Sequence, residues 1–135
     1  MKILYEDAPD AEALVNEVIG AAGFKHILKE RVFCVRSKGS KSKYIIARIH
    51  GLPKIWQRSL KIQSQYIIEV ISENYDGLDI AEREKTLIHE LLHIPKGFKG
   101  GFRHHKGWIT RRKIEGLHTL LLEKRESKKK QYFLN

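Results

Sequence analysis

Residues 85–93 read KTLIHELLH, and the expected architecture is built around them. Leu and Ile fill the positions between the polar residues, and neither Pro nor Gly interrupts the run, so we expect a buried α-helix. Residues four apart lie on the same face of a helix, about 6 Å apart along its axis. His89 and His93 therefore point the same way and can bind one metal ion, with Glu90 beside that ion.

The pattern H-E-x-x-H indicates chemistry as well as binding. A buried carboxylate and two buried imidazoles need partners, and a divalent cation supplies them. The Glu of this pattern can take a proton from a water molecule on the metal. The alternative is a solvated helix with both His residues on a polar stripe, but the apolar residues around the pattern favour the buried site.

Length and charge limit the class of protein. A chain of 135 residues predicts one domain, which we assign to residues 1–127, followed by a basic C-terminal tail at 128–135. The formal net charge is +10, from 26 Lys and Arg against 16 Asp and Glu. Non-specific binding of nucleic acid is one explanation for this charge; selection of acidic peptides and a plain solvated surface are the others.

The expected location is the cytoplasm. The single Cys34 cannot form an intramolecular disulfide and is typical of a reducing compartment. The first residues show no secretory signal, and no apolar run approaches the ~18 residues of a membrane span. The sequence leaves the oligomeric state open.

The remaining segments predict an α+β fold with a small, mainly antiparallel sheet packed against three helices. We expect residues 31–36 and 44–50 to pair as a hairpin, and Trp56 to anchor a short irregular or helical piece. Strand 65–71, just before the metal helix, is expected to line a cleft. An unpaired strand edge would face the metal there, so that an extended peptide can pair with it. The predicted helices are 7–22, 79–94 and a last one that begins at 108 or 110 and ends near 124.

A third metal ligand must come from downstream, because a catalytic zinc usually takes three protein ligands and leaves one position for water. The long form of the motif, H-E-x-x-H-x-x-G-x-x-H, fails because Lys96 and Lys99 stand where Gly and His would be. The remaining candidates are His104 and His105 in the glycine-rich loop, and Glu115 and Glu123 on the last helix.

The run 87–95, followed by Gly-Gly-Phe-Arg-x-His at 100–105, resembles a group of small metallopeptidases of archaea and phages. That group is related to the SprT-like and minimal gluzincin proteins, and the likeness covers roughly residues 44–118. It implies a zincin-like fold with Zn²⁺ bound by His89 and His93. In this group the Gly-Gly-Leu-Arg-x-His pattern carries the third ligand, which selects His105. The wider SprT-like pattern places an aromatic residue four positions after the ligand, so that Trp108 selects His104 instead. We prefer His105 because the Gly-Gly-Phe-Arg match is longer.

The resemblance and the chemistry together imply a zinc-dependent peptidase with Glu90 as the general base, which then hands its proton to the leaving amine. Arg103, Tyr75 and His104 are candidates to stabilise the oxyanion. SprT-like relatives act on DNA-bound proteins, so by analogy the substrates include proteins associated with nucleic acid. The alternatives are a nucleic-acid-binding protein with a structural or degenerate metal site, and a metal-dependent hydrolase of another substrate such as RNA.

Overall fold

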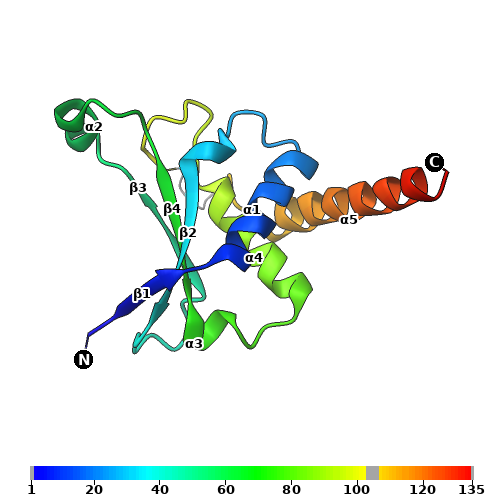
Figure 1. The fold of residues 1–135 in the computed structure, drawn as a ribbon, viewed down its shortest axis with the longest axis horizontal. Helices are drawn as coiled ribbons and strands as arrows, with labels where there is room; N and C mark the ends of the chain where they lie inside the picture. The colour runs from blue at the N-terminus through cyan, green and yellow to red at the C-terminus, as the bar shows by residue number, and fades with distance from the viewer. Residues whose placement is uncertain (1, 103–106, 135) are drawn as a thin grey trace.

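The computed structural model describes residues 2–102 and 107–134 as an α+β fold built on one four-stranded sheet (Figure 1). This confirms the expected class. The strands are β1 (Leu4–Asp7), β2 (Val32–Lys38), β3 (Ala47–Gly51) and β4 (Tyr66–Ile71). The helices are α1 (Pro9–Ala21), α2 (Lys54–Leu60), α3 (Ser72–Tyr75), α4 (Ile80–Leu92) and α5 (Arg111–Leu134), with a 3₁₀ turn at Lys29–Arg31.

The strand order across the sheet is β1-β2-β4-β3. β2 and β4 are parallel, with Val32 opposite Tyr66, whereas β1 and β3 pair antiparallel with β2 and β4. The sheet is therefore mainly antiparallel, as predicted. The predicted hairpin between residues 31–36 and 44–50 is wrong, because β4 lies between these two strands. β4 reads YIIEVI with five of its six residues buried, and such an apolar strand is stable in the centre of a sheet.

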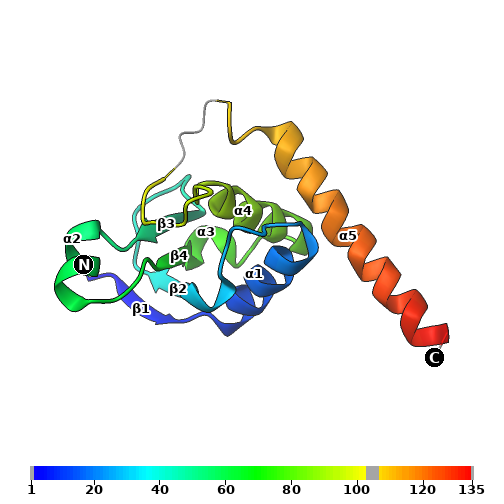
Figure 2. The ribbon, with the colours of Figure 1, turned by 90° about the horizontal axis from the view of Figure 1, so that it is seen from above.

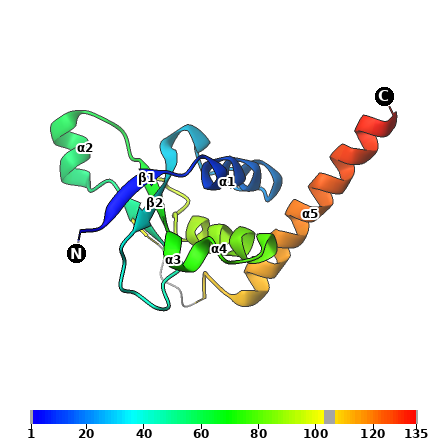
Figure 3. The same ribbon diagram turned by 60° about the horizontal axis from the view of Figure 1, so that its bottom comes forward.

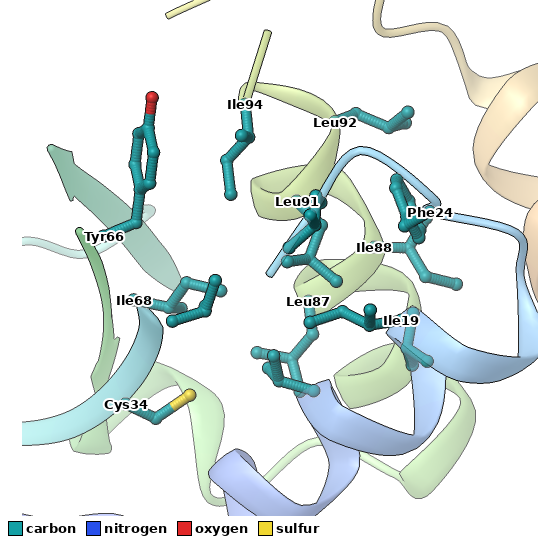
Figure 4. Packing of buried hydrophobic residues seen from close by; sticks show 14 of the residues in the cluster. Ile19, Phe24, Cys34, Tyr66, Ile68, Leu87, Ile88, Leu91, Leu92 and Ile94 are labelled. Atoms are coloured by element: carbon teal, nitrogen blue, oxygen red, sulfur yellow. The ribbon is translucent and has the colours of Figure 1, made fainter. Parts of the chain in front are cut away.

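Helix α4 packs against both the sheet and α1, which lies beside it on the same face of the sheet (Figure 3). Leu87, Ile88 and Leu91 have no exposed surface, and Figure 4 shows the side chains of α4 among those of the sheet and of α1, with Ile68 on one side and Ile19 on the other. Full burial of each such side chain contributes about 1.5–3 kcal/mol. This packing fixes the rotation of α4 about its axis and thereby the direction of its remaining face.

A buried polar cluster joins three helices. Glu84 of α4 is 1% exposed, and its carboxylate oxygens lie 2.8 Å from Nε2 of His118 and 2.5 Å from Nη2 of Arg125, both on α5. Arg125 also donates two hydrogen bonds, of 2.8 and 2.9 Å, to Glu17 of α1. We call these four residues the Glu84 cluster. Since a buried carboxylate is costly without partners, the cluster sets how α5 crosses α4.

Helix α5 continues to Leu134 and does not end near residue 124 as predicted. Residues 128–134 of the expected tail are thus helical, because Lys, Arg, Glu and Gln all have good helix propensity. Leu121 is the last buried position and Arg125 still reaches Glu17 and Glu84, whereas the turns after Arg125 extend away from the body (Figures 2 and 3). None of the helices in the described residues combines the length and apolar character that crossing a membrane requires.

Helix α2 stands at one end of the sheet, away from α1 and α4 (Figure 1). None of its residues is buried, and 56% of the surface of Trp56 is exposed. The anchoring role predicted for Trp56 is therefore wrong, because the short helix lies outside the layer where α1 and α4 cover the sheet.

Candidate functional site

Helix α4 holds His89 and His93 on one face. Its N-terminus is capped by Asp79, whose Oδ1 accepts a hydrogen bond of 2.9 Å from the backbone N–H of Glu82. His93 is the C-cap and keeps helical dihedral angles (φ −69°, ψ −18°), so the one-turn spacing of the two imidazoles is preserved. Their ring centroids are 5.2 Å apart. Two nitrogen donors on one helix face at this separation suit a shared metal ion.

Glu90 lies next to the two imidazoles and is only 7% exposed. Burial raises the pKa of its carboxyl group from 4.5 to about 8, because removal from water disfavours the charged form. A cation bound nearby has the opposite effect, since it favours the carboxylate. The group is thus able to hold or release a proton near neutral pH, which is what a general base requires.

An open pocket of about 880 Å³ lies over this face of α4. Its lining residues are Tyr44, Ile45, Ile46, Ala47, Arg48, Ile49, Lys85, Thr86, His89, Glu90, His93, Phe102 and Ile114. Six consecutive residues, 44–49, belong to β3 and the chain just before it, so the pocket meets this strand edge-on. β3 pairs with β4 alone in the described part of the chain. The predicted unpaired edge therefore borders the site, but it belongs to β3 and not to strand 65–71, which is enclosed as β4.

The third ligand is not found among the described residues. His104 and His105 lie outside them. No group of three or more His, Cys, Asp and Glu side chains in residues 2–102 and 107–134 is placed to hold a metal ion, so Glu115 and Glu123 do not join His89 and His93 there. Glu115 instead lies 3.1 Å from Nζ of Lys85, at the border of the pocket.

Several lining residues were not identified from the sequence. Lys85 and Thr86 precede His89 by four and three positions, so helical periodicity places them on its face and was a usable signal. Phe102 reaches the pocket because of the path of the loop after α4, and Ile114 because α5 crosses α4. No local sequence pattern indicates either contact. Ile45 and Ile49 depend on the strand order, which the sequence did not reveal.

Of the three oxyanion candidates, the structure describes only Tyr75. Tyr75 is 1% exposed within α3 and is not among the lining residues, so this expectation is wrong. The pKa of the Tyr75 hydroxyl is raised to about 12, mainly because the group is buried. Arg103 and His104 lie outside the described residues.

The donor set fits a metal centre, since two imidazoles on one helix face lie beside a buried carboxyl group in an accessible pocket. No curated protein and no solved structure matches the chain. A family model described as "putative phage metallopeptidase" matches residues 3–131, which is nearly the whole length. A peptidase of this kind uses a metal cofactor to hydrolyse protein substrates. The chain therefore belongs to the putative phage metallopeptidase family.

Proposed function

We propose that the protein is a zinc-dependent peptidase in which His89, His93 and His105 bind the metal and Glu90 is the general base. The observation that carries this proposal is the pair of imidazoles 5.2 Å apart beside a buried Glu90 in an open pocket. Three His ligands with one open position suit zinc among the divalent ions. His105 enters as the proposed third ligand from its place in the Gly-Gly-Phe-Arg-x-His pattern.

Glu90 and the two His residues of α4 have different roles in the proposed reaction. A bound zinc ion supplies Lewis acidity, which lowers the pKa of a water molecule and polarises a carbonyl group. Glu90 accepts a proton from the attacking water and later delivers it to the nitrogen of the departing amine. His89 and His93 fix the centre on α4, which the apolar core holds rigidly.

The free edge of β3 supports an extended substrate. A peptide that lies along this edge would hydrogen-bond to backbone groups that have no strand partner in the described structure. Its side chains would then alternate between the two faces of the extended sheet. The residues directed into the pocket would meet the apolar side chains of Ile49, Phe102 and Ile114.

The test replaces Glu90 by Gln and measures both metal content and hydrolysis of a fluorogenic peptide library. The variant should retain zinc and lose about 10²- to 10⁴-fold in turnover, the usual contribution of a general base. Glu82→Gln is the matched control, since Glu82 lies on the same helix with its side chain 57% exposed. Unchanged turnover in Glu90→Gln, or no transition metal in the purified protein, would defeat the proposal.

A second candidate function is binding of nucleic acid, either as a means of reaching associated proteins or as the main activity beside a structural metal. Five cations gather at α2 and the loop after α4, where Gln57 donates a 3.2 Å hydrogen bond to the carbonyl oxygen of Lys99. They are Lys54, Arg58, Lys61, Lys96 and Lys99, and within the described residues none of them forms an ion pair. The exposed ring of Trp56 is a surface on which an unpaired base can stack.

Fluorescence anisotropy with a labelled single-stranded oligonucleotide tests this second function. Affinity should fall steeply with salt, and Arg58→Glu should weaken it several-fold more than Lys130→Glu on α5, which changes the net charge equally. Equal losses of affinity in the two variants would show that only the net charge of the protein matters for binding. Absence of binding at low salt would remove the second function.

A further inference from the structure

The loop after α4 is held by a buried tyrosine. Tyr66 of β4 has no exposed surface, and its hydroxyl accepts a hydrogen bond from the N–H of Gly100 and donates one to the carbonyl of Gly101, both 2.9 Å long. Figure 4 shows this hydroxyl directed away from the apolar cluster that surrounds Ile68. A polar group at the border of a core thus fixes two successive peptide units of the loop.

Two further side chains hold the same loop from the same end of the sheet. Nε2 of Gln57 on α2 donates to the carbonyl of Leu52 at 2.8 Å and to that of Lys99 at 3.2 Å. The hydroxyl of Ser64 donates to the carbonyl of Phe98. Residues 98–101 therefore have their backbone groups bound to side chains that come from outside α4. This gives a function to α2, which buries no residue of its own.

The contact between this loop and the end of β3 leaves no space for a side chain at Gly51 or Gly100. A Cβ atom on Gly51 would lie 2.8 Å from the carbonyl oxygen of Gly100, and one on Gly100 would lie 2.8 Å from the carbonyl oxygen of Leu52. Gly100 also has a φ of +103°, which disfavours other residues. The loop and the end of β3 thus pack backbone against backbone, and a side chain at either glycine would force them apart.

The held segment leads directly to the pocket. Phe102, which lines it, packs edge-on against the ring of Tyr66 with centroids 5.9 Å apart. The proposed ligand His105 follows three residues later, and three residues span at most about 10 Å. The hydrogen bonds of Tyr66 therefore limit the shape of this wall and hold the segment from which the chain continues to the proposed ligand.

We infer that Tyr66 is a positioning residue of the peptidase site, which holds the loop 98–102 so that Phe102 forms one wall of the pocket. The inference rests on the proposed function for its catalytic meaning. Tyr66 touches neither the imidazoles nor Glu90 within the described structure; it acts through the loop. A merely structural role would lower stability alone, whereas a positioning role changes the site while the fold persists.

The experiment compares Tyr66→Phe with Tyr75→Phe. Both tyrosines are at least 99% buried, but the hydroxyl of Tyr75 makes no hydrogen bond in the described structure, so its removal is a matched control. Tyr66→Phe keeps the ring contacts with Phe98 and Phe102 and leaves the Gly100 N–H without its partner. We expect faster hydrogen exchange at Gly100, about 10-fold lower kcat/KM, and weaker zinc binding, while the unsatisfied N–H lowers the melting temperature by only a few degrees relative to the control.

Each outcome decides the inference. Wild-type kcat/KM and zinc affinity in Tyr66→Phe would overturn it, as would equal losses of activity and melting temperature in the two variants. If the wild-type protein hydrolyses no peptide, the proposed function fails separately. Zinc affinity then decides, because an unchanged dissociation constant in Tyr66→Phe would show that the hydroxyl does not position the site.

Discussion

Replacing Glu90 by Gln should change how the stability of the metal-depleted protein depends on pH. Burial raises the pKa of Glu90 from 4.5 to about 8, so the folded state binds this proton more tightly than the unfolded state does. Below about pH 4.5 both states hold the proton and burial carries no ionic cost. Between about pH 4.5 and 8 the unfolded state ionises first, so stability falls as the pH rises.

The size of the effect follows from the two pKa values. A difference between 4.5 and about 8, at about 1.4 kcal/mol per pH unit, gives a cost of about 3 to 5 kcal/mol above pH 8. This is a large part of the total stability of an ordinary domain, about 5–15 kcal/mol. Because Gln does not ionise, the variant should be as stable as the wild type near pH 5 and markedly more stable near pH 8.

Urea unfolding of chelator-treated protein at several pH values measures this difference. Glu84→Gln is a suitable control, since Glu84 is equally buried but is bound by His118 and Arg125, and its replacement should destabilise the protein at every pH tested. Zinc should reduce the decrease in the wild-type free energy of unfolding with rising pH, because a nearby cation favours the carboxylate. Parallel curves for wild type and Glu90→Gln across this range would refute the reasoning.

Two further predictions concern the helices and the strand edge. Arg125→Met should lower the free energy of unfolding by about 3–5 kcal/mol, because it leaves the buried Glu84 without its cation; calorimetry of the variant measures this, and a melting temperature like that of the wild type would contradict it. Methylation of single backbone nitrogens in a cleaved peptide should weaken binding at alternate positions, because only every second N–H of a strand points toward β3. A scan of KM across the methylated peptides tests this, and uniform effects would argue against strand pairing.

Much of the site could be predicted because its signal is local. The spacing of His89, Glu90 and His93 requires only that residues 85–93 form a helix, and apolar residues on both sides of the pattern make that helix strongly favoured. The beginning of α1 was predictable for a similar reason, since Pro9 suits a first helical turn. A signal that depends on one turn of helix is readable in the sequence without the fold.

The strand order was not predictable in the same way. Residues 31–36 and 44–50 are both rich in β-formers and separated by a turn-like segment, which favours a local hairpin. The two strands are separated because β4 lies between them, and this depends on non-local contacts. Ile68 and Val70 of β4 are fully buried, and a strand of this kind is most stable with a neighbour on each side. The role of Tyr66 could not be predicted for the same reason, because its hydroxyl binds a loop 34 residues away in the sequence.

The error in strand order and the position of the site are connected. Had β2 and β3 formed a hairpin with β4 beyond it, β3 would be enclosed and β4 would carry the free edge. Insertion of β4 between them moves the free edge to β3, and β3 is the strand whose residues 47–49 line the pocket above His89. The same insertion places Tyr66 beside Gly51 at the end of β3, where its hydroxyl reaches the loop that follows α4. One parallel pairing thus sets both the edge open to a substrate strand and the residue that holds the wall formed by Phe102, so a variant that disturbs the β2–β4 pairing should impair the site.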